Sequence, residues 1–286
     1  MDELAERFET HRGLLLGVAY RILGSLGEAE DAVQETWLRL SRVDADGVDN
    51  LAAWLRTVVS RVCLDVLRAR KTRPEEPVGQ QVPDQASDAD PEQEALLAES
   101  VGRALLVVLN ALGPAERVAF VLHDLFAVPF DEIAPIVGRT TATTKKLASR
   151  ARLRVRGTPV LPDTEITRNR HVVEAFLTAA RGGDLTGLLA VLAPDVVRVA
   201  DPSILPPGTP FLARGARAVA EETVVLAAKS RYAEPALVDG TVGAVVAPHG
   251  RLRLALTIVV VDDRIARYEV IADPRRLAAL EFGVLA

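Results

Sequence analysis

Apolar residues recur at helical spacing in two separate stretches of this 286-residue chain, at positions 1–73 and 95–156. In the first stretch a helix is expected near 28–42, and a longer one near 50–71 begins with Asn50 as a plausible N-cap. Apolar residues line one face of each helix: Ala29, Val33, Trp37 and Leu40 in the former, and Leu51, Leu55, Val58, Val62 and Val66 in the latter. The pattern predicts two all-helical domains.

A segment without this periodicity separates the two stretches. Residues 74–94 contain four prolines, and every charged residue among them is acidic. A segment of this composition buries too little apolar surface to fold. We therefore expect a flexible acidic linker between a domain at 1–73 and a domain at 95–157, with a second short linker at 158–164.

The pattern changes after residue 165, where helices are followed mostly by strands. Helices are predicted near 166–183, 184–192 and 215–230, and strand-like runs lie at 195–201, 236–240, 241–247, 252–263 and 264–272. Asp262 and Asp263 fall at the turn of a hairpin between the last two runs. Residues 165–286 are therefore predicted to form an α+β domain.

The composition is that of a globular protein, with 49% hydrophobic and 26% charged residues. A single cysteine, Cys63, excludes an internal disulfide framework and is expected to be a small buried side chain. The acidic beginning of the chain is not a signal peptide, and no apolar run is long enough for a membrane helix. These features predict a cytoplasmic location.

One stretch departs from the acidic balance of 34 Lys and Arg against 39 Asp and Glu. Residues 139–156 carry seven cations and no acid. On a helix, small and apolar side chains fall on one side and the cations on another. A short helix ending at Gly138 precedes it, which completes a helix-turn-helix pattern. A charged, solvated helix is the alternative, but the uniform sign and the register favour DNA binding.

A second cationic helix lies at 50–73, where Arg56, Arg61, Arg68, Arg70, Lys71 and Arg73 outnumber Asp65. Trp54, near its start, could stack on an unpaired base or pack into the core. Two basic modules joined by a tether suggest two DNA sites that are read together.

The segments AEDAVQETWLRL, AWLRTVVSRVCLDVLRAR, LGPAERVAFVLHDLFAVPFDEIAPIVG and LASRARLRVRG resemble the extracytoplasmic-function (ECF) sigma factors of bacterial RNA polymerase. The resemblance implies three sets of contact residues. Those for the polymerase clamp helices are Asp31, Gln34, Glu35 and Arg39. Those for the −10 element are Asn50, Trp54, Arg56, Thr57, Ser60 and Arg61. The helix-turn-helix resembles the region that reads the −35 element, and the contact residues that this pattern offers are Arg139, Thr143, Thr144, Lys145, Lys146, Ser149 and Arg150. Core RNA polymerase and promoter DNA are the expected partners.

The segments VVEAFLTAARGGDLTGLLAVLAPDVV and DDRIARYEVIADPRRLAAL resemble the SnoaL-like fold, a cone of curved mixed sheet with helices. ECF sigma factors with this extension form a subgroup in which the extension regulates the sigma factor in the same chain. The resemblance therefore implies contact between the C-terminal domain and the sigma modules, without a separate anti-sigma partner.

Enzymatic chemistry is the remaining question for the C-terminal domain, because some SnoaL-like proteins are cyclases or isomerases. Asp195, Asp201, His249 and Tyr268 are the nearest acid–base candidates, and each is more often a structural or surface residue. The histidines show no metal-ligand spacing, so we expect no enzyme, cofactor or metal. Two other functions stay open: a ligand-responsive helix-turn-helix regulator that does not join polymerase, and a SnoaL-type enzyme on a helical scaffold.

Overall fold

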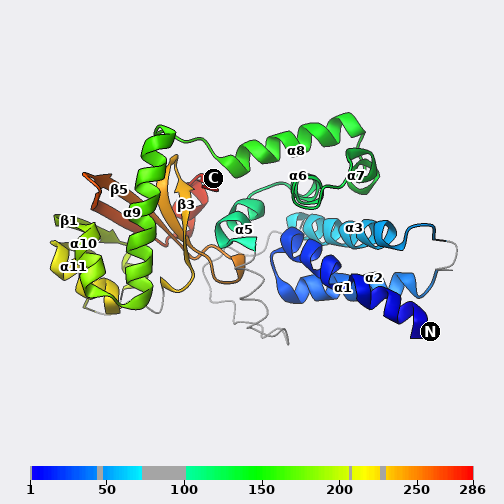
Figure 1. Cartoon of the computed structure of the whole chain (residues 1–286), viewed down its shortest axis with the longest axis horizontal. Coiled ribbons are helices and arrows are strands. Elements are labelled where there is room, and N and C mark those ends of the chain that lie inside the picture. The colour runs from blue at the N-terminus through cyan, green and yellow to red at the C-terminus, as the bar shows by residue number, and fades with distance from the viewer. Residues whose placement is uncertain (1, 44–47, 73–100, 206–207, 226–229, 286) are drawn as a thin grey trace. The chain divides into compact units, whose positions relative to one another are not determined.

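The computed structural model describes residues 2–43, 48–72, 101–205, 208–225 and 230–285. The chain forms two compact units (Figure 1). The first unit comprises residues 1–101 and 109–153, and the second comprises 102–108 and 154–286. The predicted linker at 74–94 lies outside the described residues.

Helices alone build the described part of the first unit. They are α1 (Asp2–Leu23), α2 (Leu26–Leu40), α3 (Leu51–Thr72), α6 (Pro114–Phe120), a π-helical turn (Val121–Leu125), α7 (Phe130–Val137) and α8 (Thr141–Arg156), the last of which ends in the second unit. Gly24, with a φ of 76°, allows the chain to reverse between α1 and α2. The expected apolar faces are buried or half-buried, and α1, α2 and α3 pack against one another.

A buried arginine joins the two helical stretches of the first unit. Arg117, on α6, is 3% exposed and donates hydrogen bonds to the Arg21 carbonyl of α1 and to Asn110 Oδ1. Burial, reinforced by the charge of Arg70, lowers the pKa of Arg117 to about 9. Helix α3 also contacts α6 and α7. The two helical stretches therefore pack against each other within the first unit.

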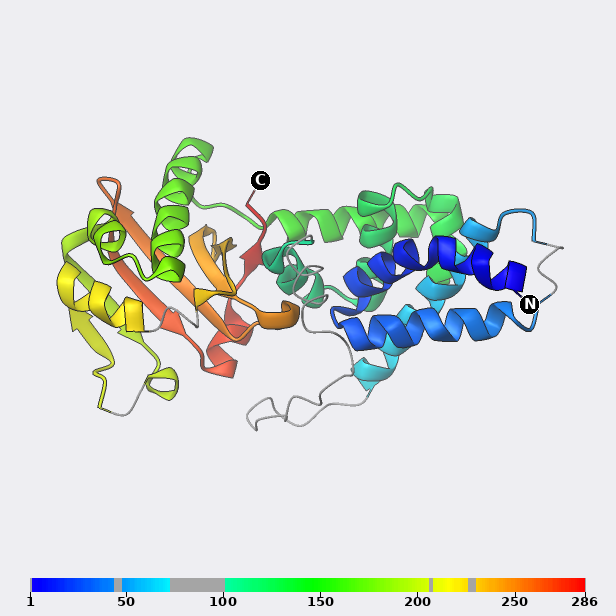
Figure 2. The same cartoon turned by 60° about the horizontal axis from the view of Figure 1, so that its bottom comes forward.

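The second unit is built around a seven-stranded mixed sheet in the order β2-β1-β6-β5-β4-β3-β7. Its elements are α9 (Asp163–Gly182), α10 (Leu185–Val191), β1 (Leu192–Ala200), β2 (Leu212–Arg214), α11 (Ala216–Val225), β3 (Ala233–Val238), β4 (Thr241–Val246), β5 (Leu254–Val261), β6 (Arg264–Ile271), α13 (Pro274–Ala279) and β7 (Phe282–Gly283). Strands β1 and β6 are parallel, and the other pairs are antiparallel. Helix α9 crosses one face of the sheet (Figure 2). The predicted helical modules followed by an α+β domain are confirmed.

The hairpin predicted at Asp262–Asp263 is present between β5 and β6. Both residues have positive φ values, 48° and 59°, which fit the tight turns that Asp tolerates in hairpins. The sequence did not predict β2, α13 or β7, which are too short to show a hydrophobic period. These short elements complete the edges of the sheet and the end of the chain.

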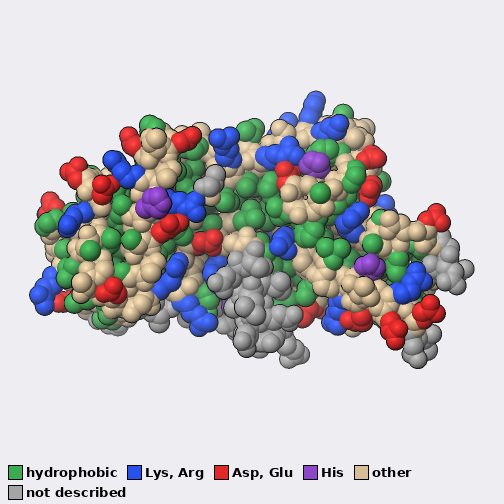
Figure 3. Space-filling view, in the orientation of Figure 1, with side chains coloured by type: hydrophobic (Ala, Val, Ile, Leu, Met, Phe, Trp, Pro, Cys, Tyr) green, Lys and Arg blue, Asp and Glu red, His purple; other side chains and the backbone are tan. Residues whose placement is uncertain are grey.

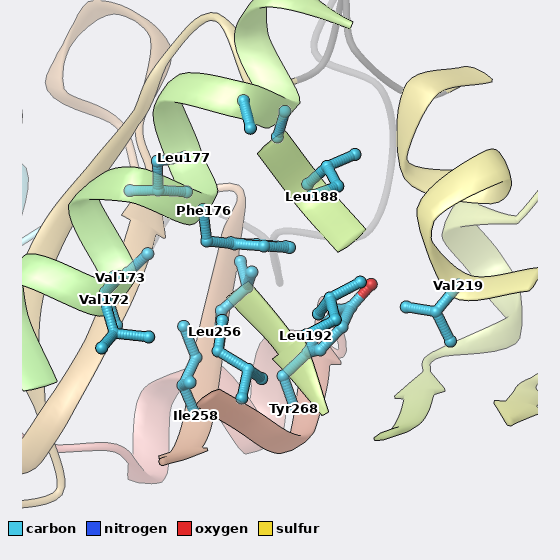
Figure 4. Close-up of a cluster of buried hydrophobic side chains, with 14 of the residues drawn as sticks. Val172, Val173, Phe176, Leu177, Leu188, Leu192, Val219, Leu256, Ile258 and Tyr268 are labelled. Carbon is cyan, nitrogen blue, oxygen red and sulfur yellow. The ribbon is translucent and has the colours of Figure 1, made fainter. Parts of the chain in front are cut away.

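Helices pack on both faces of the sheet within the second unit. On one face, α9, α10 and α11 enclose the larger apolar core, where Phe176, Leu192 and Tyr268 meet (Figure 4). On the other face, Ala104 and Val107 of α5 (Arg103–Asn110) pack against residues of β3 and β4. Residues 102–108, which include the start of α5, therefore pack with the sheet domain.

Two smaller expectations concern burial and membranes. Cys63 is fully buried, as expected, and burial raises the pKa of its thiol to about 12. No helix in the described ranges is long and apolar enough to span a bilayer.

Candidate nucleic-acid interface

A helix-turn-helix is formed by α7, Gly138 and α8. Gly138 ends α7 in the left-handed conformation, with a φ of 67°, as its place in the sequence suggested. Thr140 then begins α8, because its Oγ1 accepts a hydrogen bond of 3.2 Å from the Thr143 N–H. Ile133, Ala134 and Val137 of α7 are buried, so α8 is held by a packed first helix.

Helix α8 has one packed side and one exposed cationic side. Ala148 and Ala151 are buried, whereas most of the predicted −35 residues are exposed: Arg139, Thr143, Lys145, Lys146, Ser149 and Arg150. Lys and Arg side chains gather over α8 in the space-filling view (Figure 3). Thr144 differs from the prediction, because its side chain is fully buried and its hydroxyl donates to the Thr140 carbonyl. It therefore positions the helix and is not available to a base edge.

The exposed cations of α8 differ in whether they form ion pairs. Arg152 forms an ion pair with Asp124. In contrast, no ion pair joins Lys145, Lys146 or Arg150 to any residue that the structure describes. As far as the described residues go, the ends of these three side chains are therefore free to meet phosphate oxygens, which are the main source of salt-dependent affinity for DNA.

Helix α3 carries most of the predicted −10 residues, and these residues differ in their exposure to solvent. Asn50 is the expected N-cap, with its Oδ1 accepting the Ala53 N–H at 3.0 Å. Arg61 is exposed, and Trp54 and Thr57 are half-buried. Ser60 is fully buried and its hydroxyl donates to the Arg56 carbonyl. The prediction of a DNA contact from Ser60 does not fit this geometry, because the side chain faces the core.

Three arginines of α3 are engaged inside the first unit. Arg56 forms a 2.9 Å ion pair with Glu132 of α7, and Arg68 donates to the Val137 carbonyl at the end of the same helix. Arg70 pairs with Glu28 of α2. Part of the cationic face of α3 is thus satisfied by the chain itself.

The predicted polymerase-binding residues lie along α2 beside an open groove. The groove has a volume of about 480 Å³ and lies between α1 and α2, with Asp31 and Gln34 on its wall. Glu35 and Arg39 form a 2.9 Å ion pair on the same helix. The rings of Phe8 and Trp37, 5.1 Å apart, add an apolar part to the groove that the sequence did not reveal.

The four acid–base candidates of the sheet domain do not converge. Asp195 is exposed on β1, and His249 lies in a 3-10 turn at positive φ. Asp201 accepts the N–H groups of Ala272 and Asp273 and pairs with Arg276. Tyr268 alone lines a cavity. Among the described residues, no group of His, Cys, Asp and Glu could hold a metal ion.

Comparisons with known proteins decide the family. The Sigma-70 region 2 model matches residues 7–73, and the Sigma-70, region 4 model matches residues 102–155. The probable ECF RNA polymerase sigma factor SigI of Mycobacterium tuberculosis (strain CDC 1551 / Oshkosh) is 38% identical over 199 residues, covering 68% of this chain and 69% of the relative. The chain belongs to the ECF RNA polymerase sigma factors.

Other relatives of this sigma factor extend over more of its length. The ECF RNA polymerase sigma factor SigJ of Mycobacterium tuberculosis (strain ATCC 25618 / H37Rv) is 39% identical over 250 residues, covering 83% of this chain and 79% of the relative. The crystal structure of SigJ covers 96% of this chain and 98% of its own, at 34% identity and a TM-score of 0.47. The chain is therefore a promoter-recognition sigma factor with both regions 2 and 4.

Proposed function

We propose that this sigma factor binds core RNA polymerase through α2 and recognises a two-part promoter with α3 and α8. The groove beside Asp31 and Gln34 offers an acidic and apolar surface to a partner helix. Lys145 and Arg150 of α8, which pair with no residue that the structure describes, supply phosphate contacts at the −35 element, while Thr143 and Lys146, in the first two turns of α8, reach base edges. Acting with polymerase places the protein in the cytoplasm, and we assign it no catalytic activity of its own.

At the −10 element, α3 needs to be uncovered before it can act. The half-buried Trp54 offers a ring on which an unpaired base can stack. Arg56 contacts a phosphate or base only after leaving Glu132, and the end of α7 must leave Arg68. We therefore assign the packed first unit to the free protein and a rearranged first unit to the polymerase-bound protein.

Control by the C-terminal domain in the same chain is supported by one observation above all: the first helix matched by region 4 begins inside the sheet domain. The carboxylate of Glu234, on β3, accepts the N–H groups of Arg103 and Ala104 at 2.5 and 3.2 Å. These are unsatisfied donors at the positive end of α5, so the carboxylate both caps and holds the helix.

Helix α5 also lies close to the sheet domain further along, at Leu106. A Cβ atom added at Gly250, which has a φ of 70°, would lie 2.9 Å from Leu106 Cδ1. Only glycine therefore allows α5 to lie this close to the sheet domain. Because α5 continues into the region 4 helices, a domain that holds its start restrains the −35 module.

Run-off transcription with purified core polymerase tests both parts of the proposal. A promoter is first selected from a library with the full-length holoenzyme, and the output of Glu234→Ala is then compared with that of the parent chain. Loss of the cap should raise the output, because the −35 module is released. Glu221→Ala, an exposed carboxylate on α11, is the control and should leave the output unchanged.

The two possible failures are distinguishable. If no promoter in the library supports transcription, and the chain does not co-purify with core polymerase, the sigma assignment fails and a regulator that acts without polymerase replaces it. If transcription occurs but Glu234→Ala and the parent chain give identical output, only the claim of control through α5 fails.

A further inference from the structure

A cavity of about 90 Å³ lies on the α9 side of the sheet, within the second unit. Its walls are mostly apolar and come from α9, α11 and strands β1, β3, β4, β5 and β6, with Phe176, Val246 and Leu256 among them. The centroids of the Phe176 and Tyr268 rings lie 5.4 Å apart with the rings tilted by 54°, and the Tyr268 hydroxyl points toward α11 (Figure 4). The cavity is thus an apolar space with a polar group at one end.

The polar end is built from buried and partnered groups. Arg198 is 4% exposed, pairs with Glu222, and donates to the carbonyls of Pro210 and Phe211 at 3.1 and 3.2 Å. Its positive charge is therefore already balanced by a carboxylate. A charged ligand would add an unbalanced charge to this apolar space, at a high cost in desolvation. The electrostatics favour a neutral ligand.

The positions of the protons define which hydrogen bond is left for a ligand. The Thr223 hydroxyl gives its one proton to the Val219 carbonyl at 2.7 Å, so the Tyr268 hydroxyl donates to Thr223 at 3.2 Å. The oxygen of Tyr268 then retains lone pairs that can accept. Burial raises the pKa of Tyr268 to about 12, so the side chain stays a neutral phenol at physiological pH.

We infer that this cavity binds a small neutral molecule, mostly apolar, whose single O–H or N–H group donates to the oxygen of Tyr268. A single water needs at least about 10–15 Å³, so a cavity of about 90 Å³ holds a few waters or one small organic molecule. Phenols and short alcohols are the matching chemical classes.

The cavity shares its strands with the contact to α5. Ala233 and Val246 line the cavity, while their chain neighbours Glu234 and Val245 contact α5 on the opposite face. Successive side chains of a strand point to opposite faces, so a ligand presses on the same strands that hold the start of α5. This consequence, unlike binding itself, rests on the proposed function of α5.

Calorimetry on the full-length chain tests the inference with three probes of similar size. They are 4-methylphenol, toluene, which lacks the donor, and benzoate, which carries a charge. We expect 4-methylphenol to bind about tenfold more tightly than toluene, for one hydrogen bond, and benzoate not to bind. No binding of 4-methylphenol, or tighter binding of benzoate, would overturn the inference.

Two variants locate the site. Tyr268→Phe should bring the affinity for 4-methylphenol down to that for toluene, whereas Tyr232→Phe, which removes a hydroxyl outside the cavity, should change neither. Ala200→Leu fills the cavity and should abolish binding. If Ala200→Leu does not fold, Leu205→Trp at the half-buried rim provides the same test. Unchanged binding in the filled variant would place the probes elsewhere and overturn the inference.

Transcription then separates the site from its consequence. Saturating 4-methylphenol should change run-off output from the parent chain and leave the output of Tyr268→Phe nearly unchanged. Confirmed binding without any change in output would keep the ligand site and would overturn its coupling to α5.

Discussion

Helices α3 and α8 both bring a row of cations to a proposed promoter contact, yet the molecule uses the two rows differently. On α8, Lys146 and Arg150 are exposed and pair with no described residue. On α3, Arg56 pairs with Glu132, and Arg68 donates to a carbonyl of α7. The two helices therefore have similar charge in the sequence but differ in the structure. The cations of α8 are exposed at the proposed −35 surface, whereas some arginines of α3, at the proposed −10 surface, already contact α7.

The ion pair between Arg56 and Glu132 contributes little to holding α7 against α3. Its side chains are 23% and 44% exposed, and a pair this exposed contributes less than about 1 kcal/mol. The buried contact of Arg117 with α1 is the larger obstacle, because separating α6 from α1 strands buried polar groups. Opening of the first unit should therefore depend more on Arg117 than on Glu132.

The largest expected effect is that of Arg117→Ala. The change leaves the Arg21 carbonyl and Asn110 without this donor and opens a cavity, so the first unit should lose about 2–4 kcal/mol of unfolding free energy. Urea denaturation measures the loss, and binding of a −10 strand by the free chain should rise. Arg12→Ala, at an exposed ion pair, is the control. A loss no larger than that of the control would contradict the role given to Arg117.

The second largest effect is expected for the exposed cations of α8. Lys146→Ala combined with Arg150→Ala should weaken binding to a −35 duplex by at least about tenfold at low salt, because phosphate contacts are lost. Each lost contact should also lower the slope of log affinity against log salt by about one. Fluorescence anisotropy over a salt series measures both. Arg217→Ala on α11 is the matched control, and an unchanged slope in the double variant would mean that α8 does not meet DNA.

Acid offers a way to weaken one defined contact of the second unit, that of Asp201. Burial alone would raise the pKa of Asp201, but the N–H groups of Ala272 and Asp273 and the charge of Arg276 outweigh it and hold the pKa below its ordinary value of 3.8. The stabilisation is therefore complete above about pH 4 and is lost as the pH falls through the lower, folded-state pKa.

Asp201→Asn makes this effect measurable. The variant should be less stable than the parent by about 1–2 kcal/mol at pH 7, and the difference should shrink in more acidic solution below pH 4. Denaturation of the second unit at several pH values provides the comparison, while −10 and −35 binding at pH 7 should be unchanged. A difference that is constant across this range would contradict the assignment of the pKa shift to these contacts.

The smallest expected effect belongs to the ion pair. Glu132→Gln frees Arg56 and should strengthen binding of a −10 strand by the free chain about two- to fivefold, in line with the modest value of exposed pairs. Asp131→Asn, a neighbouring exposed acid on α7, should have no such effect. Equal gains from both variants would point to the net charge and not to Arg56.

Much of this arrangement was predictable from local pattern. The helical period, the N-cap at Asn50, the left-handed Gly138 and the hairpin at Asp262 all depend on residues close in sequence, and all are present. The −10 residues are implied by resemblance and the −35 residues by the helix-turn-helix pattern, and their contacts with DNA stay predictions. Burial of Ser60 was not anticipated, because helical spacing alone does not define how wide the packed face is.

The rest depends on contacts between distant parts of the chain. Nothing local in the sequence indicates that Glu132 meets Arg56, that Arg117 is buried beside α1, or that Glu234 caps a helix 130 residues earlier. The cavity is equally invisible, because its walls come from strands and helices spread over residues 176–270. Such features follow from tertiary packing, which single-sequence patterns do not encode.

The most direct test of the central claim compares the free sigma factor with its polymerase complex. A fluorescent single strand of the −10 element, taken from a library-selected promoter, is titrated with each, for the parent chain and for Arg56→Ala. The account predicts weak binding by the free chain, tight binding by the holoenzyme, and a loss for Arg56→Ala in the holoenzyme alone. Equally tight binding by the free chain, with the same dependence on Arg56, would show that α3 is not covered and would contradict the account.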